Sequence, residues 1–460
     1  MSSPVIQSTG KLNTPDVSKR YVSIIAAVAA FSGLLFGFDT AVINGAIVFL
    51  RKQFGLTNFQ TEMAASALLL GCLFGASIAG SLSDRFGRRK ILAAAGVLFA
   101  ASAIGAAASQ NLATFSTMRL IGGLAIGFAS TLTPIYISEI APPRNRGSLV
   151  SMNQLAIVLG ILVAYLSNWG LSSLGDSSWR WMFAVGAIPS LAFLVGLIFI
   201  PESPRWLLLK GHRPEAQAIM MRVAGEAGAQ VELDAIELAA EVEKVNSKEL
   251  LAPNMRKRLF IAVALAVLQQ ISGINTVLYY GSVIMRDHMK GQAGADAIGA
   301  NVVVGLVNLI GTIIAMFFID RWGRRALLLL ASGGMTACLV ALSLALRLPA
   351  VPIAFAFASV LFYVAFFAVG LGPGVWVYIT EIFPTELRSR ATSMAISALW
   401  ASCLAVTLTF LSIVHALGIS STFLIYALLS FMTFSFVWKF VPETRGKSLE
   451  DIQNIWGERQ

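Results

Sequence analysis

Two charged residues lie inside the apolar runs of this 460-residue sequence, away from the ends of those runs. Asp39 belongs to the segment LLFGFDTAVING, and Arg119 belongs to the run 114–138. A charge at the centre of a bilayer costs at least about 2.5 to 3.5 kcal/mol on insertion scales, and ionisable residues there usually serve a function. An Asp and an Arg at one depth should form an ion pair, and a proton on the Asp would neutralise its half. The pair therefore predicts a proton-binding site within a membrane.

Amide side chains are the second feature with chemical potential. Among the amides inside the apolar runs, we single out Gln154, Gln269, Gln270, Asn275 and Asn308. A buried amide without a partner costs on the order of 1 to 3 kcal/mol, so these groups must bind a polar ligand or one another. Hydrogen bonds between helices are the plainer alternative, because they are common in membranes.

The composition of the whole chain is that of an integral membrane protein. Apolar residues make up 57% of it and charged residues 13%. A bilayer core about 30 Å thick needs roughly 20 apolar residues per helix. Runs of this kind are expected at 21–50, 61–82, 91–110, 114–138, 148–168, 180–200, 258–285, 296–319, 326–346, 352–380, 391–414 and 420–440.

The charge pattern orients these runs. The net charge of +10 does not indicate nucleic acid, because Lys and Arg gather in alternate short loops, as the positive-inside rule requires. Both termini are then expected in the cytoplasm. On this orientation Asp39 lies roughly 27 Å above the inner end of its helix and Arg119 roughly 7 Å below the outer end of its own, so their depths nearly match. Residues 1–20 are polar and do not resemble a signal peptide.

Cysteine and metal-ligand patterns are unremarkable. Cys72, Cys338 and Cys403 fall within predicted spans at no spacing that indicates a disulfide or a metal site, and small core residues are the expected reading. We expect no cofactor and no metal.

An internal repeat divides the chain into two halves. DRFGRRK from Asp84 recurs as DRWGRRA from Asp320, and PESPR from Pro201 is echoed by PETRG from Pro442. PIYISEIAPPRNRGS likewise resembles WVYITEIFPTELRSR. Two duplicated membrane halves are typical of transporters with a binding site at the midplane. The predicted organisation is a polar tail 1–20, a six-helix bundle 21–200, a cytoplasmic helical linker 201–256, a second bundle 257–441 and a tail 442–460.

These motifs together resemble the sugar porter branch of the major facilitator superfamily over essentially the whole chain. PESPR, QQISGIN from Gln269 and GPGVW from Gly372 are the specific ones. The resemblance implies an all-α membrane protein with twelve transmembrane helices in two six-helix bundles, a cytoplasmic helical linker domain, and alternating access.

A sugar presents hydroxyl groups and an apolar face, so its site needs amides and an aromatic platform. The resemblance implies a substrate site formed by Phe36, Gln154, Gln269, Gln270, Asn275, Tyr279, Asn308 and Trp376. Tyr280 is a further candidate for the outer rim. Many relatives carry an amide where this chain has Leu399. Either one sugar hydroxyl lacks that partner here, or another residue such as Thr407 or Ser402 compensates, so the identity of the sugar stays open. Gly273 predicts a bend in helix seven that aims the amides together.

The resemblance also implies salt bridges between the two halves at the cytoplasmic side, which form while the outside is open. The candidates are Asp84, Arg85, Arg88, Glu139 and Arg146 in the first half, and Asp320, Arg321, Arg324, Glu381 and Arg388 in the second. The alternative is anchoring by positive residues alone, which does not explain the acids.

The resemblance implies proton-coupled symport of a monosaccharide, a hexose or a pentose, into the cell. A facilitative uniporter and a transporter-like sugar sensor are the alternatives. We expect no enzyme, because no nucleophile with a base, metal cluster or nucleotide loop is evident. The expected partners are a sugar, a proton and the lipid bilayer of a bacterial inner membrane, with the monomer as functional unit.

Overall fold

The computed structural model describes residues 16–141, 146–242, 253–288, 294–348, 350–383 and 385–445, and within these ranges it contains helices and no strand. The helices of the first half are α1 (Asp16–Phe54), α2 (Asn58–Phe86), α3 (Arg88–Ala108), α4 (Leu112–Ile140), α5 (Arg146–Leu171), η1 (Ser172–Leu174), α6 (Ser178–Ala184) and α7 (Ala187–Ile198). Then follow α8 (Pro204–Leu209) and α9 (Arg213–Val242). The second half contains α10 (Pro253–Ile271), α11 (Ile274–His288), α12 (Gly294–Trp322), α13 (Arg324–Arg347), α14 (Ile353–Phe366), η3 (Phe367–Leu371), α15 (Gly372–Glu381), α16 (Thr385–Leu417) and α17 (Ile419–Phe440).

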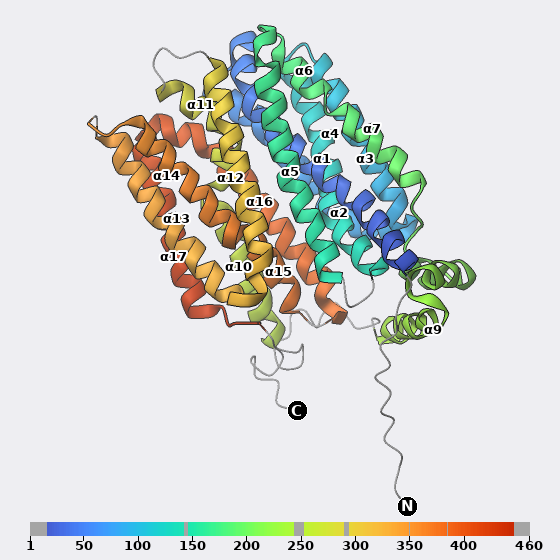
Figure 1. The fold of residues 1–460 in the computed structure, drawn as a ribbon. Coiled ribbons are helices and arrows are strands. Elements are labelled where there is room, and N and C mark those ends of the chain that lie inside the picture. The colour runs from blue at the N-terminus through green and yellow to red at the C-terminus, as the bar shows by residue number, and fades with distance from the viewer. Residues whose placement is uncertain are drawn as a thin grey trace, which may run out of the picture.

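Twelve stretches of the described residues are long and apolar enough to cross a bilayer, which confirms the predicted number. Four of them are built from more than one helical piece: α5 with η1, α6 with α7, α10 with α11, and α14 with η3 and α15. Figure 1 shows the spans of the first half, in blue to green, beside those of the second half, in yellow to red. The fold is thus the predicted pair of helical bundles.

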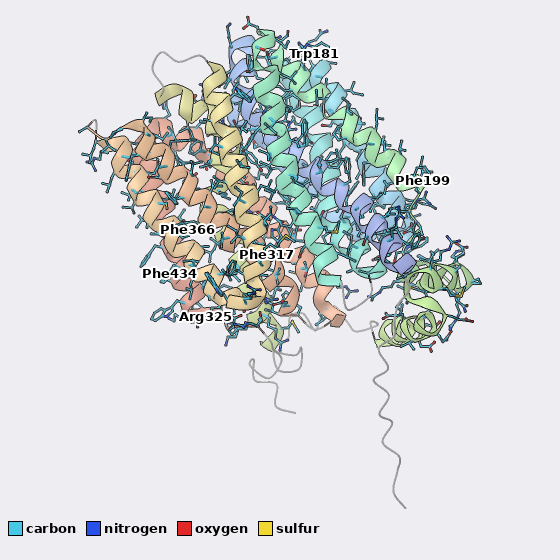
Figure 2. All side chains as sticks on the ribbon, viewed as in Figure 1. Trp181, Phe199, Phe317, Arg325, Phe366 and Phe434 are labelled. Atoms are coloured by element: carbon cyan, nitrogen blue, oxygen red, sulfur yellow. The ribbon has the colours of Figure 1, made fainter. Side chains whose placement is uncertain are left out.

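The outer surface of both bundles is apolar. Trp181, Phe199 and Phe317 are 57%, 77% and 66% exposed, and their side chains point away from the bundles (Figure 2). A soluble protein rarely exposes so many large apolar groups. This surface is suited to contact with lipid.

The helices α8 and α9 lie at one end of the bundles, beside the beginning of α1 (Figure 1). They share a small apolar cluster that includes Leu207, Met220 and Leu233. We call this end of the molecule the linker end and the opposite end the distal end.

The bend predicted at Gly273 is present as a break, and the second half contains another break near Gly372. Gly273 has φ +88° and separates α10 from α11, a backbone conformation that favours glycine. The Ser272 hydroxyl donates to the Gln269 carbonyl, and both the backbone N–H and the hydroxyl of Thr276 donate to the Gly273 carbonyl, so side chains and backbone together bind the acceptors around the break. The glycines 370 to 374 lie where the span changes from α14 through the π-helical η3 to α15. Irregular backbone at this depth is tolerated where it lines a cavity or packs on protein.

Candidate functional site

A pocket lies between the two halves, with walls from α1, α5, α10, α11, α12, α15 and α16. All eight residues that the sequence analysis proposed for substrate binding line it: Phe36, Gln154, Gln269, Gln270, Asn275, Tyr279, Asn308 and Trp376. The structure therefore brings these side chains together around one cavity.

The amides around the break in helix seven form a connected chain. Gln269 Nε2 donates to the Leu371 carbonyl at 2.6 Å, and Gln270 Nε2 donates to Gln269 Oε1 at 3.2 Å. Asn275 Nδ2 donates to Gln270 Oε1 and to Cys403 Sγ, the latter at 3.1 Å. Gln269 thus connects the site to the irregular segment η3, and Asn275 connects it to α16. The chain fixes the amide orientations before any ligand arrives.

Aromatic side chains supply apolar walls. Trp376 is half-buried in the middle of α15, and Phe36 packs against Trp400 with ring centroids 5.6 Å apart. Trp400 was not among the predicted substrate residues, yet it lines the pocket. Its indole Nε1 is buried and has no hydrogen-bond partner among the described residues. An unpartnered buried donor is costly, so a ligand hydroxyl that accepts from it is favoured.

The structure bears on the secondary expectations for Tyr280, for Leu399 and for the residues proposed to substitute at position 399. Tyr280 lies outside the pocket, because it follows Tyr279 and so projects from another face of α11; its hydroxyl donates to the Thr407 carbonyl at 3.1 Å. Leu399 lines the pocket, as its place before Trp400 predicted. The two proposed substitutes do not: Thr407 is fully buried, and the Ser402 hydroxyl donates to the Ala398 carbonyl.

Asp39 and Arg119 form the predicted ion pair. Arg119 Nη1 contacts Asp39 Oδ1, and Arg119 Nη2 donates to the Asp39 backbone carbonyl at 2.8 Å. The Arg119 side chain is fully buried and lies over the Phe183 ring, with Cζ 5.2 Å from the ring centroid. Asp39 Oδ2 is buried without a hydrogen-bond partner among the described residues. This oxygen is therefore available to take up a proton.

The ion pair is directly linked to the pocket through α1. Phe36 and Thr40, which line the pocket, lie within one helical turn of Asp39. A shift of α1 that accompanies a change in the ion pair must therefore move the pocket wall.

Hydrogen bonds join the two halves toward the distal end. Asn44 on α1 donates to the Leu278 carbonyl at 2.8 Å and to Asn301 Oδ1 at 3.3 Å, and it also contacts Ser282. Tyr165 on α5 donates to the same Leu278 carbonyl at 2.9 Å. All these groups are buried, so this network closes the pocket toward the distal end.

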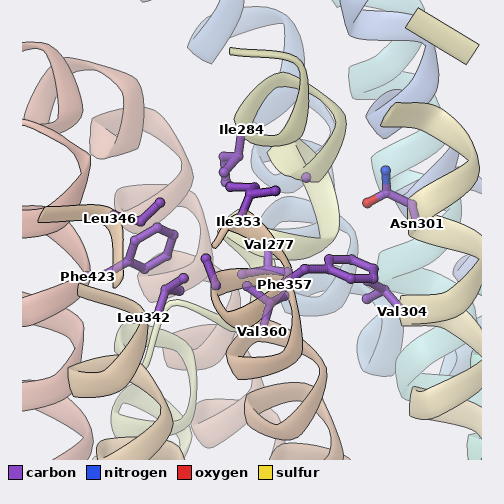
Figure 3. Close-up of a pocket in the computed structure, with 12 residues that line it drawn as sticks. Val277, Ile284, Asn301, Val304, Leu342, Leu346, Ile353, Phe357, Val360 and Phe423 are labelled. Carbon is purple, nitrogen blue, oxygen red and sulfur yellow. The ribbon is translucent and has the colours of Figure 1, made fainter. Parts of the chain in front are cut away.

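A second, apolar pocket lies between α11 and the helices α13, α14 and α17 (Figure 3). Val277 and Ile284 of α11 face Leu342 and Phe423 across it. Apart from Asn301 its lining side chains are apolar. One side of α11 therefore faces the amide-lined pocket and α1. Another side faces the apolar pocket.

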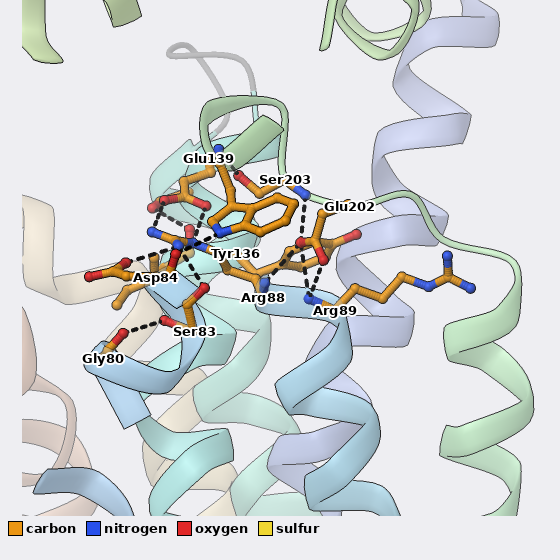
Figure 4. A network of polar contacts seen from close by, with 12 residues as sticks. Gly80, Ser83, Asp84, Arg88, Arg89, Tyr136, Glu139, Glu202 and Ser203 are labelled. Atoms are coloured by element: carbon orange, nitrogen blue, oxygen red, sulfur yellow. Dashed lines mark hydrogen bonds and ion pairs between the residues drawn. The ribbon is translucent and has the colours of Figure 1, made fainter. Parts of the chain in front are cut away.

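A polar cluster at the linker end explains the first copy of the repeated motifs (Figure 4). Glu202 accepts the backbone N–H groups of Arg88 and Arg89 at 2.9 and 3.0 Å, and so caps α3. Arg88 also pairs with Glu139 at 3.2 Å and Asp84 at 3.0 Å. Gly87 has φ +101°, and a Cβ there would lie 2.4 Å from Glu202 Oε2, which explains the glycine of the motif.

The second copy repeats this arrangement. Glu443 accepts from the backbone N–H groups of Arg324 and Arg325 at 2.9 and 3.0 Å, and Arg324 pairs with Glu381 at 2.8 Å. Gly323 takes the place of Gly87, with φ +91°. The duplicated motifs thus build the same capped and paired helix end twice.

These ion pairs lie within each half, while the expected bridges join the halves. The distal end is closed here, and the expected bridges belong to the opposite state, so they stay a prediction. Arg85 and Arg321 are exposed, and Arg85 lies over the Phe86 ring. The side chains of Arg146, Asp320 and Arg388 lie outside the described set.

Glu62 is a polar group that the sequence analysis missed. It is fully buried near the distal end of α2, and its carboxylate accepts from the Ser412 N–H at 2.8 Å and hydroxyl at 2.7 Å on α16. Its place at the edge of an apolar run gave it the pattern of an interfacial residue. The sequence feature that could have singled it out is the position of a charged residue four residues into α2, and so inside the helix.

Known proteins were compared with this chain by sequence and by structure. A family model described as "Sugar (and other) transporter" matches residues 25–456. The arabinose-proton symporter of Bacillus subtilis (strain 168) is 39% identical over 446 residues, which cover 95% of this chain and 96% of the relative. The D-xylose-proton symporter of Escherichia coli (strain K12) is 36% identical over 474 residues, with 95% and 96% covered.

Solved structures show the same fold. A structure of the proton:xylose symporter XylE bound to 6-bromo-6-deoxy-D-glucose matches with a TM-score of 0.82 and 34% identity, covering 95% of this chain and all of that one. A partially occluded inward-open conformation of the xylose transporter XylE from E. coli matches with a TM-score of 0.83 and 33% identity. It covers 93% of this chain and 100% of that one.

Proposed function

The chain belongs to the sugar transporter family, and on this basis we propose that it carries a monosaccharide, a pentose or a hexose, into the cell together with a proton. The observation that supports this most directly is a buried Asp39–Arg119 pair within one helical turn of an amide-lined pocket. Relatives named as arabinose-proton and D-xylose-proton symporters support the same class of cargo.

The pocket suits a sugar because it combines neutral hydrogen-bonding groups with aromatic surface. Gln154, Gln269, Gln270, Asn275 and Asn308 can each donate and accept, as sugar hydroxyls do. Trp376 and Trp400 offer faces for the apolar side of the ring, and Trp400 Nε1 adds an unused donor. We assign the substrate site to these residues with Phe36 and Tyr279.

The proton binds at Asp39 in this mechanism. While Asp39 is ionised, its attraction to Arg119 holds α1 against α4. Protonation weakens that attraction, so α1 and the pocket wall that it carries can reorient. One charge that crosses about 100 mV supplies roughly 2.3 kcal/mol, enough for roughly 50-fold accumulation at one proton per sugar.

The orientation follows from the same proposal. We place the linker end and both termini in the cytoplasm of a bacterial cell, with the distal end outside and the monomer as the working unit. The closed distal network then corresponds to a state that releases sugar inward. The charged residues near the linker end serve as the gate of the opposite state.

Uptake of labelled D-xylose and L-arabinose into proteoliposomes tests the proposal. Accumulation above the external concentration should require an inward proton gradient and should vanish when a protonophore removes it. Equal, non-accumulating entry with and without the gradient would instead establish a facilitative uniporter. Specific binding without any entry would establish a sensor.

A further inference from the structure

One oxygen of the proton-binding carboxylate has no partner among the described residues. Asp39 Oδ1 contacts Arg119, whereas Asp39 Oδ2 is buried and accepts no hydrogen bond from the described part of the chain. A buried hydroxyl group is costly unless it finds an acceptor, and this holds for the O–H that forms when Oδ2 binds a proton. The groups next to Oδ2 therefore influence how readily Asp39 binds a proton.

Gly122 of α4 borders the space beside this oxygen. A Cβ atom at Gly122 would lie 2.6 Å from Asp39 Oδ2 and 2.5 Å from Ser102 Oγ. Both oxygens therefore lie close to one point, and the distance between them cannot exceed the sum of these two values. Glycine leaves this space open, since any larger side chain would displace one of the two oxygens.

Ser102 offers an acceptor at this place. It lies on α3, is 1% exposed, and its hydroxyl donates to the Met118 carbonyl of α4 at 2.8 Å. Because the single hydroxyl proton is used in that bond, the lone pairs of Ser102 Oγ stay available. An acceptor beside a carboxyl group stabilises the protonated form and not the ionised form.

Arg119 keeps other partners when Asp39 becomes neutral. It is the charged group in contact with Asp39, and the thiol of Cys72 on α2 is a titratable group of the same region. Arg119 Nη2 donates to the Asp39 backbone carbonyl at 2.8 Å, and the guanidinium lies over the Phe183 ring. Neither of these two interactions needs the negative charge of the Asp39 side chain. The carboxyl group can therefore turn away without leaving Arg119 isolated.

We propose that Ser102 positions the transported proton: when Asp39 binds a proton at Oδ2, the new O–H donates to Ser102 Oγ across the space at Gly122. This inference rests on the proposed symport. A rotation of the Asp39 carboxyl group, once its hold on Arg119 is weakened, brings the two oxygens together, while the Ser102 hydroxyl keeps its own bond to Met118. Protonation then exchanges a side-chain contact between α1 and α4 for one between α1 and α3. Ser102 is a positioning residue, because it acts through Asp39.

The test measures how uptake of labelled D-xylose by the full-length protein in proteoliposomes depends on pH. Ser102→Ala removes the acceptor, and Gly122→Ala fills the space with a methyl group. Ser190→Ala is the matched control, because Ser190 is also 1% exposed and donates to a backbone carbonyl at 2.8 Å, but this carbonyl belongs to Gly186 beside its own helix α7. Thermal unfolding of each purified variant is measured in parallel.

We expect the pH of half-maximal uptake in Ser102→Ala to move to more acidic values by about 0.7 pH unit, since losing one net hydrogen bond lowers the proton affinity about fivefold. Gly122→Ala should shift this pH in the same direction, because its methyl group separates the two oxygens. Ser190→Ala should keep the parental value. If Ser102→Ala does not fold, Ser102→Cys, whose sulfur is a weak acceptor, should show the same acidic shift.

A parental pH of half-maximal uptake in the folded Ser102 variant would overturn the role of Ser102 while leaving symport intact. If thermal stability falls as well, Ser102 serves helix packing alone. A shift to alkaline pH would also overturn the proposal, because it would mean that the Ser102 hydroxyl donates to the ionised carboxylate. A parent whose uptake is independent of pH and of the proton gradient would overturn the proposed symport, and the role of Ser102 with it.

Discussion

Asp39 performs two tasks with one carboxylate, since Oδ1 contacts Arg119 while Oδ2 is without a partner among the described residues. Asp39→Asn mimics the protonated state permanently. Sugar accumulation and its pH dependence should be lost, while sugar binding and at least part of the exchange across the membrane persist. Uptake and counterflow in proteoliposomes measure both, with Asp176→Asn, an exposed acid, as the control. Accumulation with proton entry in Asp39→Asn would mean that the proton takes another route.

Gln269 lies at the centre of the pocket polar chain, because it binds both Gln270 and the backbone of η3. Gln269→Ala removes a hydroxyl partner and releases the Leu371 carbonyl. We expect roughly 5- to 150-fold weaker sugar binding, which corresponds to about 1 to 3 kcal/mol. Equilibrium binding of xylose measures this, and Gln230→Ala on the exposed side of α9 is the matched amide control. Unchanged binding would remove Gln269 from the site.

At the scale of the single residue, the sequence singled out polar groups that the structure gathers around one pocket, but it did not predict the orientation of every side chain. Asp39, Arg119 and the five amides were identifiable because polar groups stand out in apolar runs. The sequence could not show which of Trp400 and Tyr280 lines the pocket, since an aromatic side chain suits both a core and a pocket. Only the rotation of α11 and α16 decides which of them lines the cavity.

At the scale of the element, α11 is the piece best suited to open the distal end. Gly273 separates it from α10, its polar contacts with α1 centre on Asn44, and the apolar pocket offers space beside it (Figure 3). Bending at Gly273 away from α1 would break the network and reduce that space. The sequence predicted the break from a glycine, but not the direction of movement, which depends on long-range packing.

Asn44→Ala should therefore shift the protein toward a distal-open state. Losing one net hydrogen bond of about 1 kcal/mol changes the population ratio about fivefold. The readout is the rate at which an impermeant maleimide labels Ile161→Cys, a pocket position, from the distal side. Asn168→Ala is the control, because Asn168 is equally buried but donates to the Val42 carbonyl within its own half. Equal labelling in both variants would contradict a closing role for Asn44.

At the scale of the whole molecule, duplication places equivalent chemistry at the linker end of both halves. Glu202 caps α3, and Glu443 caps α13, each beside a glycine at positive φ and an Arg–Glu pair. The motif repeat was sufficient to predict two halves of similar build. It was not sufficient to assign these acids to a cap, because a carboxylate near arginines is equally expected to pair with their side chains.

The cap assignment predicts matched effects in the two halves. Glu202→Gln and Glu443→Gln each keep an acceptor oxygen but remove the charge that complements two N–H groups and the positive end of a helix dipole. We expect each to lower the free energy of unfolding by about 0.5 to 2 kcal/mol. Thermal unfolding of the purified protein compares the two with Glu215→Gln, an exposed acid in the first turn of α9. A loss of stability in only one of the two variants would show that the repeated motifs have diverged in role. No loss in either variant would contradict the cap assignment and would mean that Glu202 and Glu443 act on the arginine side chains rather than on the helix ends.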